Sequence, residues 1–215
     1  MFMGILAIIP FHAGEYYTDG LAIKILSKKD KTSDIYYELL KLTYSWTFNT
    51  KQNVKEIDEL EKLEYKCLNF IEEPLDNKVL DQEIITHLLF QLVTLNIINE
   101  KYTRCIQLIQ PFITKKYLKG ISREEVIISY LYAKLAIEHK IEEPLFELNF
   151  NKSIFHVIPK IKYKALLLFS EQQKSLAITT LESAKKELLK TNVNLYNNQQ
   201  DMVVIDKFIE IMENN

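Results

Sequence analysis

Apolar residues recur every three or four positions along most of this chain, which is the spacing of one face of an α-helix. The clearest case lies between Ile57 and Ile71, where glutamate and lysine fill many of the positions between the apolar residues. From Ser33 onward the pattern predicts a succession of amphipathic helices joined by short turns. The predicted helical segments are 33–49, 53–73, 79–99, 102–117, 122–137, 158–169, 172–190 and 202–212, with a short helix and a loop within 141–155.

The segment Val79–Asn99 is apolar around most of its girth, so we expect it to be buried on several sides and to lie centrally. Tyr102–Tyr117 follows almost at once, which predicts an antiparallel hairpin of the two helices. Pro111 lies inside the second helix and is expected to kink or break it. Gly120 is expected to close that helix.

Two positions carry residue types that begin helices. Ser122 with Glu125 has the spacing of a capping box, in which each side chain accepts a hydrogen bond from the other residue's backbone N–H. Thr32 or Ser33 is expected to cap the helix that follows residue 33.

The alternation of helix and short turn repeats every 35–45 residues or so, the range of tetratricopeptide and related helical repeats. The predicted fold is therefore all-α, with about eight or nine helices in antiparallel hairpins that stack as a tetratricopeptide-like right-handed array. The consensus residues of such repeats are missing. Stacked hairpins form concave surfaces that hold peptides or helices, so the predicted partner is a protein or peptide.

Composition narrows the function classes. Apolar residues make up 47% and charged residues 26% of the 215 residues, as in soluble globular proteins. Only 4 glycines and 5 prolines occur, too few for the turns of an all-β fold. The net charge is −2 with no basic excess, which argues against a nucleic-acid partner. Residues 1–11 are apolar but shorter than a membrane span, and a possible membrane association is assigned to them.

Residues for catalysis are sparse. None of the four histidines has a second histidine four positions on, so HExxH is absent, and no glycine-rich phosphate loop occurs. His87 lies in an apolar helix and is expected to be a core histidine. Cys67 and Cys105 lack metal-site spacing and are expected to be free, buried thiols.

The stretch from Pro10 to Leu26 has an unusual residue order. An apolar run stops at Pro10, a polar turn follows, and Asp19-Gly20 opens an amphipathic segment. On residue chemistry alone, Asp19 is an N-cap, Gly20 is a turn residue and Pro10 ends a short helix. The following cluster, Ser27–Lys31, is either a solvated linker or a basic patch beside a membrane.

The same stretch resembles a motif of the site-2 protease family of intramembrane zinc metallopeptidases, in a bacterial variant. There, Asn-x-x-Pro precedes a variable stretch, then Asp-Gly and an amphipathic segment that ends in basic residues. By this resemblance Asp19 is a zinc ligand and Gly20 allows close backbone approach, whereas Ala7 replaces the family's asparagine. A catalytic zinc needs three protein ligands, and this chain lacks the HExxH that supplies the other two.

These observations predict a non-catalytic protein- or peptide-interaction module. Residues 1–31 form an apolar segment with the Asp-Gly motif and a basic linker, and residues 32–215 form the helical-repeat-like domain. The resemblance implies the cytosolic tail of a site-2-protease-like membrane protein, cytoplasmic and at the inner face of the cell membrane. The alternatives are a zinc metallopeptidase component whose HExxH lies on another chain, and a standalone cytosolic peptide-binding protein. No cofactor is expected without such a partner chain.

Overall fold

A computed structural model of the chain describes the backbone of residues 12–13, 16–17, 19–48, 55–72, 79–120, 122–139, 148, 150, 157–190 and 196–215. Side chains are described for 22–42, 61–69, 82–120, 122–139, 148, 150, 157–190 and 200–215.

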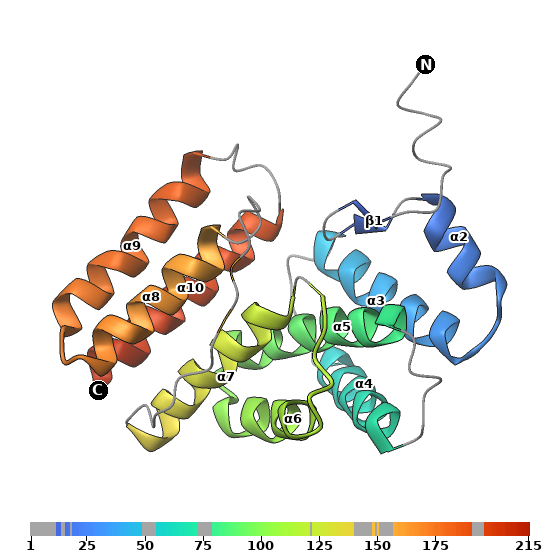
Figure 1. Ribbon diagram of the computed structural model, residues 1–215, viewed down its shortest axis with the longest axis horizontal. Helices are drawn as coiled ribbons and strands as arrows, with labels where there is room; N and C mark the ends of the chain where they lie inside the picture. The colour runs from blue at the N-terminus through green and yellow to red at the C-terminus, as the bar shows by residue number, and fades with distance from the viewer. Residues whose placement is uncertain are drawn as a thin grey trace. The chain divides into compact units, whose positions relative to one another are not determined.

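The fold is all-α, as the sequence pattern predicts (Figure 1). The one β feature of the described residues is a short antiparallel pair, in which His12 and Ala13 oppose Tyr17 and Tyr16. The elements in chain order are β1 (His12–Ala13), β2 (Tyr16–Tyr17), α2 (Asp19–Ser27), α3 (Lys31–Phe48), α4 (Lys55–Glu72), α5 (Val79–Ile98), α6 (Tyr102–Thr114), α7 (Arg123–Glu138), α8 (Val157–Ser170), α9 (Lys174–Lys190) and α10 (Tyr196–Asn214).

The chain divides into two compact units. Unit 1 contains residues 1–91 and 116–123, and unit 2 contains residues 92–115 and 124–215, so the division falls within α5. The predicted helix and loop within 141–155 and the apolar run 1–11 lie outside the described residues. Within the described residues, no helix is both long enough and apolar enough to cross a membrane.

In unit 1, α2 packs on α3 through a tight turn. Ile25 is 1% exposed and is the inward residue of α2. The cap of α3 differs from the predicted one, because Asp30 fills the position expected for Thr32 or Ser33. Asp30 Oδ1 accepts the Ser33 N–H at 3.0 Å, and Ser33 Oγ accepts the Asp30 N–H at 3.0 Å. This reciprocal pair is a capping box that begins one turn earlier than expected.

The helix α5 is buried on nearly every side, as its apolar girth predicts. Ile84, Ile85, Leu89, Leu92 and Val93 are each 0% exposed, and they point in different directions around the helix axis. Thr86 and Asn96 are also buried, and each returns a hydrogen bond to a backbone carbonyl four residues earlier. An apolar helix tolerates these two polar residues because each side chain donates a hydrogen bond to the backbone of its own helix.

The turn after α5 leads directly into α6 and has a left-handed residue at Glu100. The Lys101 N–H donates to Asn96 O and the Glu100 N–H donates to Ile97 O, which is the Schellman pattern. The turn between α8 and α9 repeats this pattern around Gln172, which has φ 63°.

Two expectations for α6 are corrected. Pro111 does not break the helix, which continues to Thr114, since proline removes only one donor near the end of the helix. Gly120 does not close it either. Lys116, with φ 52°, takes the left-handed position just beyond the helix, and Gly120, with φ 79°, lies in the loop before α7. A Cβ at Gly120 would come within 3.0 Å of Glu83 Cγ, so a side chain there would be strained and crowded.

In unit 2, α9 packs against both α8 and α10 (Figure 1). The contact face of α9 carries Ala177, Leu181, Ala184 and Leu188, at the three-and-four spacing of one helix face. Ala177, Leu181 and Ala184 are 0% exposed. The small alanines permit close approach of neighbouring helices, as the sequence indicates.

Candidate functional site

The Asp-Gly motif opens a helix. Asp19 and Gly20 are the first two residues of α2, but the side chain of Asp19 lies outside the described side chains and Pro10 lies outside the described residues altogether. The roles of Asp19 as an N-cap and as a zinc ligand both stay predictions. Among the side chains that are described, no three histidine, cysteine, aspartate or glutamate residues gather closely enough to hold a metal ion.

Both cysteines are free and 0% exposed, as expected from their helical positions. Burial, with a smaller effect of the neighbouring Glu64, raises the pKa of the Cys67 thiol well above its usual range. A thiol with a raised pKa supplies almost no thiolate at neutral pH, and the thiolate is the reactive form. Cys67 therefore belongs to the core and is unsuited to nucleophilic chemistry.

Ser122 and His87 form a close pair in unit 1. Nδ1 of His87 lies 3.0 Å from Oγ of Ser122, which occupies the position before α7 predicted for a helix cap. Burial lowers the pKa of His87 to about 4, so its imidazole is neutral at pH 7. A catalytic base works best with a pKa near the operating pH, and Ser122 is only 4% exposed. The pair is therefore structural. His87 is half-buried, and its contact with Ser122 satisfies the imidazole, as the sequence predicts for a histidine packed in this helix.

Acid should destabilise the protein through His87. Unfolded, this histidine has a pKa near 6.5, and burial lowers it to about 4 in the fold. Between these values the unfolded state binds more protons, so the free energy of unfolding falls as the pH drops from 6.5 to 4. The expected loss is on the order of 2–3 kcal/mol, measured by urea denaturation at a series of pH values.

The substitution His87→Gln should remove this part of the acid sensitivity. Ser122→Ala is the matched control, because it removes the partner hydroxyl and keeps the imidazole. It should lower stability by about 1 kcal/mol at every pH and leave the pH dependence unchanged. If the free energy of unfolding of His87→Gln falls with acid as much as that of the unmodified protein, other groups cause the acid sensitivity.

A buried charge cluster lies in unit 2 and joins α7, α8 and α10. Lys162 is 1% exposed, and its Nζ lies 2.8 Å from the Glu125 carboxylate and 3.6 Å from Asp201 Oδ1. Beside it, the Tyr132 hydroxyl donates to the Lys162 carbonyl at 3.0 Å. The ring of Tyr132 stacks on Phe208 with 3.6 Å between centroids and 3° between planes.

The protonation state of Lys162 decides what this cluster can do. Desolvation lowers its pKa, but the charges and hydrogen bonds of Glu125 and Asp201 outweigh desolvation and raise the pKa above 10.5. A lysine nucleophile needs a neutral amine, but with a raised pKa the amine of Lys162 stays protonated at neutral pH. Because the folded pKa is the higher one, the ion pair stabilises the fold at neutral pH and loses that effect only above pH 10.5. The cluster therefore has a structural role, in which it joins α7, α8 and α10.

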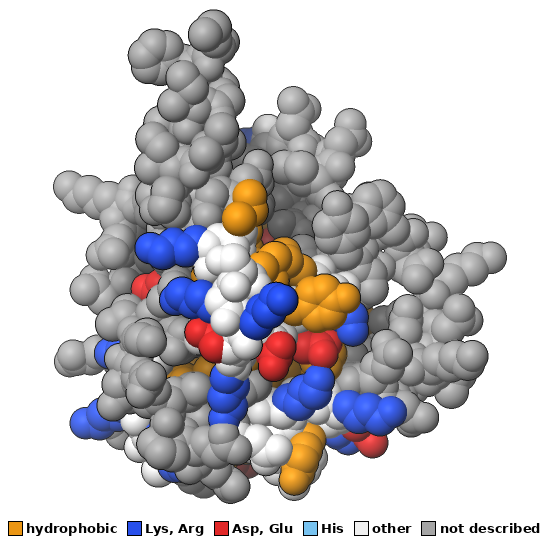
Figure 2. All heavy atoms as spheres, turned by 90° about the vertical axis from the view of Figure 1, so that its right-hand side faces the viewer, with side chains coloured by type: hydrophobic (Ala, Val, Ile, Leu, Met, Phe, Trp, Pro, Cys, Tyr) orange, Lys and Arg blue, Asp and Glu red, His pale blue; other side chains and the backbone are white. Residues whose placement is uncertain are grey.

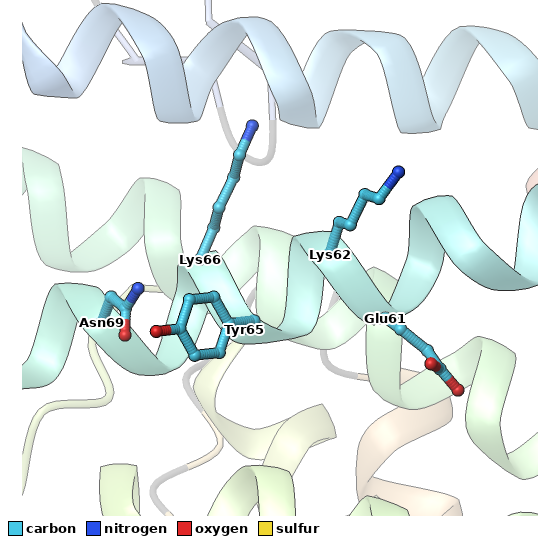
Figure 3. A pocket seen from close by; sticks show the side chains of 5 residues that line it. All are labelled: Glu61, Lys62, Tyr65, Lys66 and Asn69. Carbon is cyan, nitrogen blue, oxygen red and sulfur yellow. The ribbon is translucent and has the colours of Figure 1, made fainter.

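An open hollow of about 620 Å³ lies along one face of α4. Its lining residues have the spacing that places them on one side of a helix: Glu61, Lys62, Tyr65, Lys66 and Asn69. Tyr65 is 67% exposed, an unusual amount for an aromatic side chain. Figure 3 shows Lys62 and Lys66 extending on the same side of α4, with the Tyr65 hydroxyl directed along the helix towards Asn69.

Glu38 of α3 pairs with one of the lysines that line the hollow. Its carboxylate lies 2.8 Å from Nζ of Lys66 and 3.8 Å from Nζ of Lys41. Nζ of Lys41 in turn lies 5.0 Å from the ring centre of Tyr37, which is 53% exposed. We name the surface formed by Tyr37, Lys41, Lys62, Tyr65 and Lys66 the tyrosine–lysine surface. It combines two exposed tyrosine rings with exposed lysine side chains.

Comparison with family models, with curated proteins and with solved structures finds no match to this chain. The resemblance to site-2 proteases rests on the residues from Pro10 to Leu26 alone and stays a prediction.

Sequence reasoning missed the tyrosine–lysine surface. Lys62 and Lys66 lie on the side of α4 expected to face water, but Tyr65 was not assigned to that side. The signal was present, because Tyr65 follows Glu61 by four positions on the polar face. Glu64 was also missed, since it belongs to the expected wet face and is only 4% exposed.

Proposed function

We propose that this chain is a non-catalytic interaction module that binds a peptide segment of a protein partner on the tyrosine–lysine surface. One observation carries the proposal. The hollow on α4 places a 67% exposed tyrosine between two exposed lysines in one open surface. Exposed tyrosine contributes large contact area at low entropic cost and is enriched at protein interfaces.

The charges define the ligand. Lys62 has no carboxylate partner among the described residues, and Lys66 is held only by the surface pair with Glu38. Exposed ion pairs contribute about 0–1 kcal/mol, so a ligand carboxylate can replace Glu38 at little cost. The expected ligand therefore carries an acidic residue beside an apolar one, with the apolar side chain against the Tyr65 ring.

The helical hairpins support the same function. The α5–α6 and α8–α9 turns have the same hydrogen-bond pattern, and their left-handed residues lie roughly 70 positions apart, about twice a tetratricopeptide repeat. We infer that the hairpins are divergent repeats of one unit. Arrays of this kind serve as scaffolds for peptide recognition. A tail attached to a membrane protein and a standalone cytosolic protein are both compatible with this role.

The test is a selection from a displayed library of random peptides on the immobilised full chain. The enriched peptides should carry an acidic residue near an aromatic or aliphatic one. Their affinity, measured by fluorescence polarisation, should fall at least about tenfold in Tyr65→Ser and in Lys62→Glu, as for a residue central to an interface.

The control variants are Lys186→Glu and Leu176→Ser, which make comparable changes at exposed positions of α9. They should retain the affinity of the unmodified protein. Equal binding of the enriched peptides to Tyr65→Ser and to the unmodified chain would refute this assignment, and so would a selection that enriches nothing.

A further inference from the structure

A second surface of unit 1 combines outward aliphatic side chains with lysines, at the helix α2. Ile25 is the inward residue of α2, and Ile23 and Leu26 lie on other sides of the helix. Ile23 is 67% exposed and Leu26 is 36% exposed, although both are aliphatic. Lys24 is also exposed and flanks them. This arrangement puts aliphatic side chains on the solvent-exposed face of a short helix, with a lysine beside them.

The turn that follows adds two more exposed lysines in a fixed conformation. Lys28 and Lys29 lie between α2 and α3, and Lys29 has φ 50°. The Lys28 N–H donates to Ile25 O, and the Ser33 hydroxyl lies 3.0 Å from the same carbonyl. The turn is therefore held from both sides by hydrogen bonds, and its lysines are presented by an ordered backbone.

Lysines outnumber acidic residues in this part of the chain. Residues 22–42 contain five lysines and three acidic residues, in a chain whose net charge is −2. The Asp30 carboxylate within the turn is engaged with the Ser33 N–H. Figure 2 looks onto this side of the molecule and shows hydrophobic, lysine and acidic side chains next to one another.

We propose that the surface formed by Ile23, Lys24, Leu26, Lys28 and Lys29 docks onto an anionic lipid surface. The lysines supply attraction to acidic headgroups, and the two aliphatic side chains enter the headgroup region. The crest of a helix suits a lipid surface, because aliphatic tips can enter it, whereas a peptide is bound in a hollow such as the one on α4. This inference rests on different residues from the tyrosine–lysine surface and stands independently of the peptide proposal.

The test is flotation of the full chain with vesicles of phosphatidylcholine alone or with phosphatidylserine added. The bound fraction should rise with the phosphatidylserine content and fall as salt is raised from 0.1 to 0.5 M, since screening shortens the electrostatic range. Lys24→Glu/Lys28→Glu/Lys29→Glu should weaken binding at least about tenfold. Lys160→Glu/Lys164→Glu/Lys186→Glu makes the same charge change on exposed sites of unit 2 and should bind as the unmodified chain does.

The apolar contribution has its own pair of variants. Ile23→Ser/Leu26→Ser should weaken binding about tenfold, whereas Leu176→Ser/Leu189→Ser, at exposed leucines of α9, should not. Circular dichroism checks that all variants keep their helix content.

Three results would overturn the proposal. One is equal binding to neutral vesicles. Another is undiminished binding of the lysine variant, which would assign membrane contact to the unchanged apolar residues 1–11. The third is lysine-dependent binding of soluble polyglutamate with no vesicle binding, which would identify an acidic protein partner instead.

Discussion

Replacing Lys162 with methionine should lower the free energy of unfolding by about 3–5 kcal/mol. The methionine side chain fills similar space, so the loss comes mainly from charge. Glu125, whose side chain is 11% exposed, would keep its negative charge without the ammonium group 2.8 Å away. Asp201 is 31% exposed and can recover part of its hydration. Urea denaturation followed by circular dichroism measures the change.

The matched control is Lys160→Met, two positions earlier on α8 and exposed to solvent. It should change stability by no more than about 0.5 kcal/mol. Lys162→Met/Glu125→Leu should recover at least half of the loss, because a buried ion pair replaced by apolar groups is often nearly neutral. A Lys162→Met protein as stable as the unmodified one would show that the cluster is not buried in solution.

The second large effect is expected for Phe208→Ala, which should cost about 3–5 kcal/mol. Phe208 is 0% exposed on α10 and stacks on Tyr132 of α7. Removing the ring leaves a cavity against Tyr132, whose hydroxyl is fixed to the Lys162 carbonyl and restricts collapse into the space. The thermal midpoint and the urea midpoint should both fall.

Two further substitutions separate the contribution of aromatic stacking from that of apolar burial and provide a surface control. Phe208→Leu keeps an apolar side chain and loses the aromatic stacking, so it should cost less than Phe208→Ala. Val203→Ala, on the same helix and 42% exposed, should be nearly neutral. If Phe208→Ala and Val203→Ala have similar stabilities, α10 does not pack on α7 through this ring.

Helix positions were accessible from the sequence, because a helix interior is decided by local spacing. The predicted segments 79–99 and 158–169 correspond to α5 and α8 within a residue at each end. Ser122 lies just before α7 as predicted. Its hydroxyl lies 3.0 Å from Nδ1 of His87, and the carboxylate of Glu125, the other residue of the predicted capping box, contacts Lys162. The errors occur at helix ends, where Asp30 replaced Ser33 as cap and Lys116 replaced Gly120 as the left-handed residue. Several polar residues can satisfy an exposed helix end, so composition does not select one.

The candidate site was harder to locate from the sequence than the helices were. The residues chosen from sequence, Pro10, Asp19 and Gly20, lie in or beside the part of the chain whose side chains are not described, and their role stays a prediction. The tyrosine–lysine surface was not chosen, because exposure of Tyr37 and Tyr65 depends on which face of α3 and α4 the other helices cover. Tyrosine is intermediate between the mostly buried and the mostly exposed residue types, so residue type alone does not decide its burial.

The sequence by itself determined that this protein is all-α, where most of its helices lie and that α5 is buried on nearly every side. These follow from periodicity and apolar content, which are local properties of the chain. Only the tertiary structure decided that Lys162 meets Glu125, that His87 meets Ser122, and that Ile23 and Tyr65 remain exposed. Such pairings join residues 35 or more positions apart, and their energies depend on burial, which no local pattern records.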